Sequence, residues 1–520
     1  MLLAAFVGLG PARARATGFT EIGQDIERRD KDKWGADIAG YLRMRTEALG
    51  NFDLDRGLTP SGEPLFPVSA SEPTRQTLTH GDMRLRTDLK FYAPGNMVAV
   101  KARLDALDNI ALGSAPEGIP SATVSQRATG DLLRLRRAWG EVLLPFGLLA
   151  AGRMGNSWGL GMLANGGDCL DCDSGDSADR IAFLTPVLGH IFAAAYDFSA
   201  TGPQVARRAQ GRTIGTEPST DVRSFTFAAL RYHDEGARMR RNNAGKLTVD
   251  YGAYVAHRWQ ASDVPVSYLP VAQPAALTAT DVMVRGYKAT ALDAWTRVTS
   301  RSLRVEAELA YLTATVDQPS LLPGVLYRKP ATSTQLGAAL ESDIGRAEGP
   351  VGAGLDMGYA SGDAAPGFGA VIRPGAAAPK PGDLDGAQAN PPFDNRADNF
   401  RFHPDYRVDR ILFREIIGTV TDAAYVRPHV RFTPVRFSSG ELTLSLAAVA
   451  STAVRASSTP NGKAPLGVEL DPTLLYTSRN GFLAALEHAV LFPLAGLDND
   501  ARGLSAKPAQ LLRLRLQFVF

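Results

Sequence analysis

The chain has 520 residues, of which 45% are hydrophobic and 21% charged, with a mean hydropathy of −0.10 and a formal net charge of +2. This composition excludes intrinsic disorder, because the apolar content is ample and the net charge is small. It also excludes a helical membrane protein, because no apolar run approaches the roughly 18 residues that a transmembrane helix needs. Only 10 of the 56 basic residues are Lys and the other 46 are Arg, which suits planar contacts with carboxylate and phosphate.

The N-terminus has the features of a secretory signal peptide. Residues 2–9 form a short apolar segment, and an A-x-A cleavage site ends at Ala16. We therefore expect residues 1–16 to be a signal peptide that is removed on export. Residues 17–33 are charged and do not alternate, so we expect them to form a periplasmic lead-in.

Alternation of apolar and polar residues recurs through the rest of the chain. It is clearest in the C-terminal segment LRLRLQFVF at 512–520, and it recurs at 40–45 and 83–91. In a strand, successive side chains point to opposite faces, so one face of each segment is apolar and the other is charged. Transmembrane barrels have this pattern when the outer face meets lipid and the inner face lines a wet channel.

The alternation predicts about 18 strands. They span 35–48, 79–92, 97–109, 130–144, 146–154, 179–186, 190–199, 222–233, 246–259, 284–298, 301–316, 333–346, 350–361, 422–435, 439–454, 466–478, 481–493 and 509–520. Short turns and long loops alternate between them, except at the basic stretch 234–245, and this alternation is typical of outer-membrane barrels with short periplasmic turns and long extracellular loops. We therefore predict an all-β fold, a transmembrane antiparallel β-barrel at 34–520, with 16 strands as the alternative because 179–186 is the weakest.

Several segments resemble known outer-membrane proteins. The alternating last strand, which ends on Phe520, is similar to the assembly signal of Gram-negative outer-membrane proteins. Other segments resemble barrels of the porin and alginate-export type, namely LRRAWGE (135–141), AGRM (151–154), WGLG (158–161), DMGYASGD (356–363) and FRFHPDY (400–406). The chain also resembles an uncharacterised outer-membrane family of myxobacteria. The resemblance implies an integral protein of the Gram-negative outer membrane that contacts lipid, with Phe520 recognised by the barrel-assembly machinery.

The register of the last strand assigns charged side chains to the lumen. With Phe520 facing lipid, the basic residues expected to line the pore are Arg43, Arg45, Arg84, Arg86, Lys101, Arg103, Arg134, Arg136, Arg153, Arg513 and Arg515. The acidic residues expected to line it are Glu306, Glu308, Glu341, Asp343 and Asp356. These two walls would face each other across the ring and set up a transverse field that orients polar solutes. The alternative is that such charges pair across neighbouring strands and rigidify the barrel.

The longest connection, 362–421, is the predicted site of pore constriction. Residues 409–417 have apolar side chains at helical spacing and precede Gly418, which predicts a short helix. A loop of this length usually has a function, and we expect it to fold into the lumen. The alternative is an extracellular flap.

The two cysteines, Cys169 and Cys172, are predicted to form a disulfide, because export favours oxidation and no second half-site for zinc is present. Nearby carboxylates offer a weaker calcium candidate, although their spacing departs from a calcium-binding loop. These carboxylates are Asp168, Asp171, Asp173 and Asp176.

The sequence contains no catalytic motif, and its seven His residues are scattered, so we expect no enzyme, no cofactor and no bound metal. We expect no nucleic-acid partner. The sequence predicts an outer-membrane channel for passive diffusion of polar, in particular anionic, solutes through an Arg-rich lumen. The alternative is a structural or adhesive surface barrel with an occluded lumen.

Overall fold

The computed structural model shows most of the chain beyond the predicted signal peptide. The residues that it describes are 18–23, 33–72, 76–95, 97–113, 133–207, 211–264, 278–320, 325–346, 349–370 and 380–520. The predicted signal peptide at 1–16 lies outside these residues, and so does most of the lead-in predicted at 17–33. Across the described ranges, no helix has the length and apolar character to cross a bilayer.

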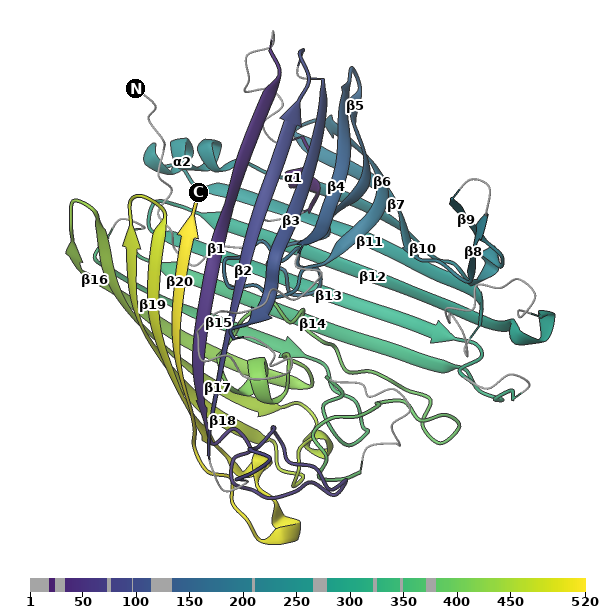
Figure 1. Ribbon diagram of the computed structural model, residues 1–520, viewed down its shortest axis with the longest axis vertical. Helices are drawn as coiled ribbons and strands as arrows, with labels where there is room; N and C mark the ends of the chain where they lie inside the picture. The colour runs from purple at the N-terminus through teal and green to yellow at the C-terminus, as the bar shows by residue number, and fades with distance from the viewer. Residues whose placement is uncertain are drawn as a thin grey trace, which may run out of the picture.

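Eighteen strands form one closed antiparallel sheet, in which β1 pairs with both β2 and β20 (Figure 1). The strands are β1 (Gly35–Gly50), β2 (Thr77–Tyr92), β3 (Val98–Ala111), β4 (Leu133–Leu144), β5 (Gly147–Gly155), β6 (Ser177–Val187), β7 (His190–Ala200), β10 (Val222–Arg231), β11 (Thr248–Asp263), β12 (Met283–Thr299), β13 (Leu303–Val316), β14 (Ala331–Ile344), β15 (Val351–Ala360), β16 (Ala423–Arg436), β17 (Gly440–Ala453), β18 (Pro465–Ser478), β19 (Phe482–Pro493) and β20 (Ala509–Val519). The predicted all-β barrel of 18 strands is therefore confirmed. The strand predicted at 179–186, where the alternation is weakest, is present as β6.

A hairpin and a helix in the connections between the barrel strands were not predicted. The loop after β7 contains a hairpin of β8 (Gln204–Arg207) and β9 (Arg212–Gly215). The basic stretch at 234–245 contains a helix, α2 (Glu235–Asn243), whose first turn is capped by the Asp234 carboxylate accepting from the backbone N–H of Ala237 at 2.8 Å. This helix explains why a connection between β10 and β11 is longer than the other turns at that end of the barrel.

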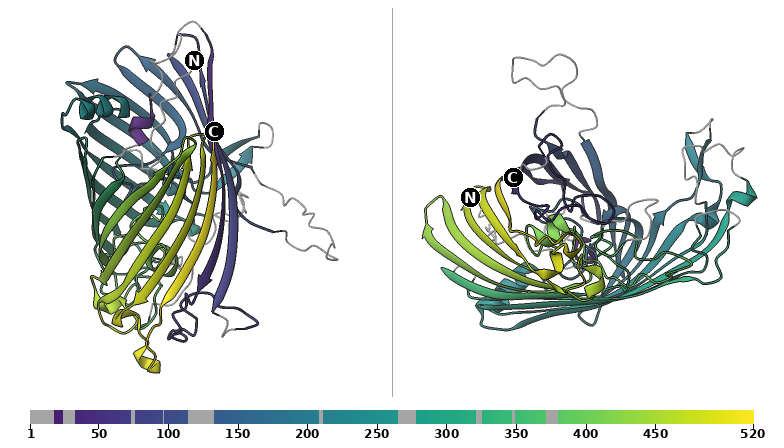
Figure 2. Two further views of the ribbon diagram at one scale, coloured as in Figure 1. Left: turned by 90° about the vertical axis from the view of Figure 1, so that its left-hand side faces the viewer. Right: turned by 90° about the horizontal axis from the view of Figure 1, so that it is seen from below.

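The two faces of the barrel wall differ as a membrane protein requires. On β20, Leu512, Leu514 and Phe518 are exposed on the outside, whereas Arg513 and Gln517 are buried inside. Closure pairs the backbone donors and acceptors of the strands, so the ring can cross hydrocarbon without exposed polar edges. The short turns lie at the end where β1 begins and β20 ends, and the long loops lie at the other end (Figures 1 and 2). The protein is an integral outer-membrane β-barrel, with the short turns on the periplasmic side.

Two long loops fold inward and lie within the ring of strands (Figure 2). Plug loop 1 is residues 156–176, between β5 and β6, and plug loop 2 is residues 399–422, the last part of the connection between β15 and β16. Apolar side chains from both loops, including Met162, Phe402 and Ile411, are buried in one cluster with small residues of the barrel wall such as Ala310. This cluster is a hydrophobic core that the barrel encloses. The short helix predicted at 409–417 is a single π-helical turn, η4 (Leu412–Ile416).

Candidate functional site

The arginines of β1 and β2 hold the backbone of plug loop 1. Arg43 and Arg84 are fully buried and donate to the carbonyl oxygen of Cys172 at 3.0 and 2.7 Å. Arg86 donates to the carbonyl oxygen of Gly167 at 2.5 Å. Because these guanidinium groups alternate with apolar residues along two neighbouring strands, they form a ladder facing the lumen. Much of the Arg-rich wall is therefore engaged by the protein's own loop.

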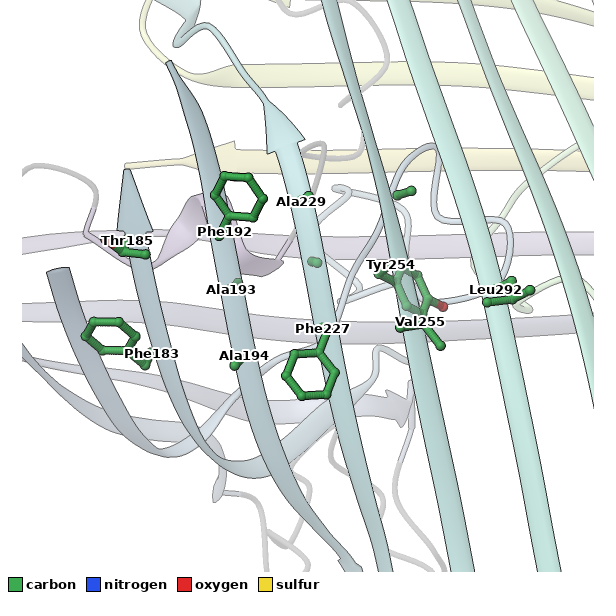
Figure 3. Close-up of a pocket in the computed structure, with 12 residues that line it drawn as sticks. Phe183, Thr185, Phe192, Ala193, Ala194, Phe227, Ala229, Tyr254, Val255 and Leu292 are labelled. Atoms are coloured by element: carbon green, nitrogen blue, oxygen red, sulfur yellow. The ribbon is translucent and has the colours of Figure 1, made fainter. Parts of the chain in front are cut away.

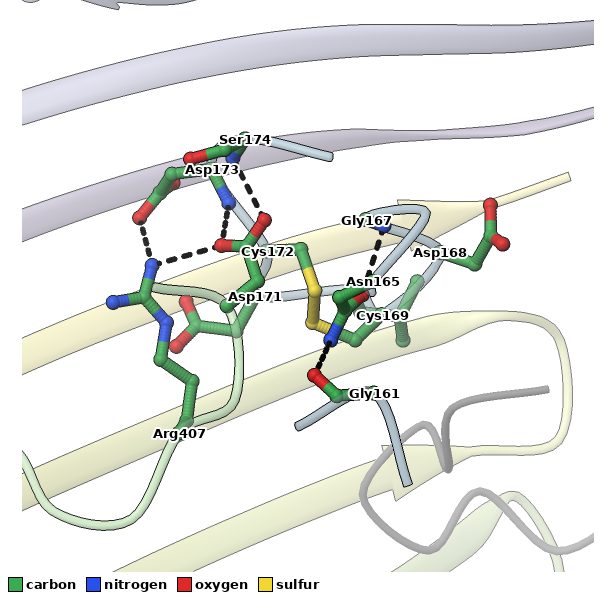
Figure 4. Close-up of a disulfide and its surroundings, with 12 residues drawn as sticks. Gly161, Asn165, Gly167, Asp168, Cys169, Asp171, Cys172, Asp173, Ser174 and Arg407 are labelled. Atoms are coloured by element: carbon green, nitrogen blue, oxygen red, sulfur yellow. Dashed lines mark hydrogen bonds and ion pairs between the residues drawn. A yellow bond between two sulfur atoms is a disulfide. The ribbon is translucent and has the colours of Figure 1, made fainter. Parts of the chain in front are cut away.

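The aspartates of plug loop 1, which flank the disulfide drawn in Figure 4, pair with arginines of the same wall. Asp173 accepts from Arg43 at 2.8 Å and from Arg45 at 2.7 Å. Asp171 accepts from Arg45 at 3.1 Å and lies 3.7 Å from Arg513. Cys169 and Cys172 form a disulfide that closes the turn carrying these groups.

The calcium candidates all contact cationic or histidine side chains. Besides the pairs of Asp171 and Asp173, the Asp168 carboxylate pairs with Arg103 and Arg137, and Asp176 lies 3.5 Å from His403. No group of three or more His, Cys, Asp or Glu side chains within the described residues could hold a metal ion. Of these carboxylates, Asp171 and Asp173 neutralise arginines of the ladder, and Asp168 neutralises arginines of β3 and β4.

Cross-strand ion pairs extend this network along β2, β3 and β4. Arg86 pairs with Asp105 at 2.7 Å, and Arg103 pairs with Asp88 at 2.6 Å. Lys101 pairs with Glu141 on β4 at 2.9 Å. These contacts are the pairing between neighbouring strands that the sequence left open as an alternative.

The predicted inward position of Arg153 is wrong. The pairing of β3 and β4 is irregular between Arg103 and Leu104, and beside this bulge both Arg136 and Arg137 reach carboxylates of the lumen. The alternation therefore changes phase along β4, and the Cα partner of Arg153 is Ala138, one residue after Arg137. Arg153 lies on the outer face and pairs with Asp179 at 2.6 Å, with 52% of its side chain exposed.

The remaining basic candidates lie inside the barrel. Arg134 lies 3.4 Å from Asp108 and is mostly exposed. Arg515 pairs with Glu487 on β19 at 3.1 Å, and Arg513 pairs with Glu47 on β1 at 2.5 Å. The last strand therefore continues the basic wall of β1 and β2.

The acidic wall of β13, β14 and β15 contains cations of its own. Arg304 pairs with Glu306 at 2.6 Å, with Glu341 at 2.8 Å and with Asp343 at 3.2 Å. Asp356 accepts from Arg427 of β16 at 2.6 Å. The two walls are thus less segregated than predicted, because Arg304 shares the inward register of Glu306 and Glu308 and was overlooked.

Two carboxylates of the barrel wall, on β13 and β18, bind backbone N–H groups of the plug loops. Glu308 of β13 accepts the backbone N–H groups of Leu160 at 2.5 Å and Leu163 at 3.3 Å in plug loop 1. Glu469 of β18 accepts the backbone N–H groups of Arg410 at 2.8 Å and Ile411 at 2.9 Å in plug loop 2. Both carboxylates are almost fully buried, and each binds loop backbone that would otherwise be unpaired.

Asp409 braces the π-helical turn of plug loop 2. Its carboxylate accepts the backbone N–H groups of Phe413 at 2.9 Å and Arg414 at 3.1 Å. Burial raises the pKa of Asp409 to about 7, and the neighbouring Asp471 adds to this effect, although the bonds from Phe413 and Arg414 oppose it. The attachment of this turn therefore contains a group that titrates near neutral pH.

The two plug loops are joined to each other by charges. Asp405 of plug loop 2 accepts the backbone N–H of Asp173 at 2.8 Å, and Arg407 pairs with the Asp173 carboxylate at 2.8 Å (Figure 4). Arg414 pairs with Asp171 at 2.7 Å. Burial alone would raise the pKa of Asp171, but Arg414 and neighbouring arginines hold it well below its ordinary value, so this carboxylate stays ionised. We call this meeting point of Asp171, Asp173, Arg407 and Arg414 the charge junction.

The sequence interpretation missed the carboxylates of β18 and β19. Glu469 and Asp471 alternate with apolar residues, and Glu487 is the Cα partner of Arg513. The register anchored on Phe520 could have identified Glu487 through this pairing. The contacts of Glu469 with plug loop 2 had no signal in the sequence.

The described part of the lead-in also contacts the lumen. Helix α1 (Gly18–Glu21) carries Glu21, which lies 3.3 Å from Arg137, and Phe19, whose ring lies 5.4 Å from the guanidinium of Arg180. The backbone N–H of Gly23 donates to Glu141 at 3.0 Å. Residues 18–23 therefore pack on the inner face of β4 and β6.

Comparisons with known proteins give similarity of overall architecture only. No protein-family profile and no curated protein sequence matches the chain. Solved structures with a similar arrangement include OccK9 (OpdG) of Pseudomonas aeruginosa, with 13% identity, coverage of 93% of this chain and 98% of that chain, and a TM-score of 0.46. OpdK of the same organism, solved with vanillate, has 12% identity, coverage of 93% and 98%, and a TM-score of 0.43. An anion-selective porin from Comamonas acidovorans has 8% identity, coverage of 94% and 100%, and a TM-score of 0.39.

Similarity at this level carries no argument about what passes through the barrel. The resemblance to alginate-export barrels and to a myxobacterial family stays a prediction. The recognition of Phe520 by the assembly machinery also stays a prediction.

Proposed function

We propose that the protein is an outer-membrane channel for passive diffusion of small polar solutes, with the charge junction as its constriction. The observation that carries this proposal is the exposure of charged side chains where the two plug loops meet the wall. Asp171 and Asp173 keep 19% and 26% of their side-chain surface accessible, and Arg407 keeps 22%. Charges that remain accessible beside a buried core support a narrow, water-filled route through the plug.

Unpaired donors at the junction support a preference for anionic solutes. Arg407 Nε, Arg513 Nη2 and Arg515 Nε are buried and have no hydrogen-bond partner among the described residues. A buried guanidinium with an unused N–H gains from any carboxylate, sulfate or phosphate that reaches it. Arg407 pairs with Asp173 at 2.8 Å, Arg513 lies 3.7 Å from Asp171, and the charge of Arg515 acts on Asp171 as well. A small anion that enters the junction could therefore exchange with the carboxylates of plug loop 1.

The same plug also supports a second candidate, a structural or adhesive barrel with an occluded lumen. Phe402, Ile411 and Phe413 of plug loop 2 are at most 2% exposed and pack against the wall. A core of this kind blocks the part of the cross-section that it fills. The two candidates therefore differ in whether the charge junction leaves a continuous route.

Liposome permeation distinguishes these candidates. We expect proteoliposomes to admit a small carboxylate faster than an amine of the same size, and to exclude large sugars. Uptake of both small solutes at the rate of protein-free liposomes would contradict the channel and favour the occluded barrel. Faster uptake of the amine would contradict the anion preference and leave the channel standing.

A further inference from the structure

The outer wall of the barrel has an apolar groove of about 510 Å³ across β6, β7, β10, β11 and β12 (Figure 3). Its floor is formed by small side chains, Ala194, Ala229 and Ala253, which lie close together in the register of three neighbouring strands. Exposed side chains, including Phe192 and Phe227, stand around this floor as ridges. Because the outer wall meets hydrocarbon, the groove is accessible to a lipid chain within the membrane.

The groove ends at a polar row on the periplasmic side. Arg231 is two residues after Ala229 on β10, so it lies on the same outer face, and its Cα partner on β11 is Tyr251. The hydroxyl of Tyr251 lies 2.8 Å from Nε2 of His190, which begins β7. Arg231 and Tyr251 are exposed and His190 is half-buried, and all three lie at the strand ends next to the short turns. This is the depth at which lipid headgroups meet a barrel wall.

Arg231 lacks the carboxylate that its counterpart at the other end of β10 has. Arg223 lies on the same strand and face near the extracellular end, where it pairs with Asp221 at 3.0 Å. In the part of the chain that the structure describes, Arg231 has no carboxylate within ion-pair distance and no hydrogen-bond partner for its side chain. A guanidinium at the boundary of a membrane can bind a phosphate group in a planar, bidentate contact with two N–H groups.

We propose that Arg231 and the groove form a binding site for an anionic glycerophospholipid of the periplasmic leaflet. The lipid phosphate binds the Arg231 guanidinium, and the Tyr251–His190 pair supplies hydrogen bonds to the glycerol and ester oxygens. One acyl chain lies over the alanine floor between Phe192 and Phe227. The charge of Arg231 selects an anionic headgroup, and the shape of the groove fixes the chain. The site depends only on the membrane location of the barrel, not on what the lumen conducts.

Native mass spectrometry of the purified full-length barrel tests this site with two lipids of equal chain length, phosphatidylglycerol and phosphatidylcholine. We expect one retained phosphatidylglycerol and about a tenfold preference for it, which is the effect of one charged hydrogen-bonded contact. Arg231→Gln should abolish the preference. The matched control Arg223→Gln, on the same strand and face, should keep it. Equal retention of the two lipids by the unmodified protein would overturn the proposal, and so would equal loss of preference in both variants.

A second variant tests the groove without changing the charge. Ala229→Leu combined with Ala253→Leu fills the floor and keeps Arg231, and we expect it to weaken retention of both lipids about tenfold. Heat-dependent migration in gels verifies that each variant is a folded barrel. Unchanged lipid retention in this variant would overturn the proposal. A change of oligomeric state with unchanged lipid retention would do so as well, because it would assign the face to contact between copies of the chain.

Discussion

The carboxyl group of Asp409 makes the attachment of plug loop 2 dependent on pH. Its pKa in the folded protein is about 7, above the ordinary value of an aspartate, because it is buried beside Asp471. Between the ordinary pKa of an aspartate and pH 7, the folded state therefore keeps a proton on Asp409 that the unfolded state has released. As pH rises through this range, the contribution of Asp409 to the attachment of plug loop 2 decreases, and above pH 7 this contribution is lost.

Single-channel recordings at different pH values test this dependence. We expect current fluctuations from movement of plug loop 2 to increase between pH 5 and pH 8, because the buried Asp409 becomes ionised next to Asp471. Asp409→Asn, which stays neutral, should show the same low fluctuation at both pH values. Fluctuations that rise equally with pH in this variant would assign the effect to another group.

Arg304 controls the charge balance of the acidic wall. It is the cation that contacts Glu306, Glu341 and Asp343 together. Arg304→Gln leaves these carboxylates clustered without that charge, so we expect the reversal potential in a salt gradient to shift toward cation selectivity. Arg431→Gln is the matched control, because within the described residues Arg431 of β16 donates only to the carbonyl oxygens of Arg346 and Gly349. Equal shifts in the two variants would show that only net charge matters.

At the scale of elements, the disulfide turn of plug loop 1 presents backbone to the arginine ladder. The bond between Cys169 and Cys172 holds the carbonyl of Cys172 against Arg43 and Arg84. Reduction removes this constraint, and we expect the mean conductance to rise and the current noise to increase. The double variant Cys169→Ser, Cys172→Ser should behave like the reduced protein and should not respond to reductant. An unchanged current on reduction would show that the ladder alone holds the turn.

The strands were predictable from the sequence, whereas the plug was not. A strand facing lipid on one side and charge on the other has a period of two, so local sequence is enough to locate it. The bulge beside Arg137 has no such signal, and it reversed the inferred direction of Arg153. The plug depends on contacts such as Glu469 with Ile411, whose residues are far apart in the chain. Neither periodicity nor spacing encodes which wall residue a loop will meet.

At the scale of the whole molecule, the barrel encloses a second folded layer. The wall supplies guanidinium groups to loop carbonyls and carboxylates to loop N–H groups, so the plug is fastened on several sides of the ring. Its hydrophobic core fills one part of the lumen, and the charge junction lies at its polar edge. We therefore expect the Arg-rich wall both to hold the plug and to bind solutes with its remaining donors.

Single-channel conductance in planar bilayers is the decisive test of whether plug loop 2 constricts a conducting lumen. We compare the unmodified protein with a variant in which residues 399–420 are replaced by a short Gly/Ser linker. We expect small, anion-preferring current steps for the unmodified protein, and steps several times larger with weaker selectivity for the variant. Steps of equal size in the two proteins would overturn the proposed constriction, because removing plug loop 2 would then leave the conducting route unchanged. An unmodified protein that conducts no current would overturn the proposed channel function, because the charge junction would then leave no route through the barrel.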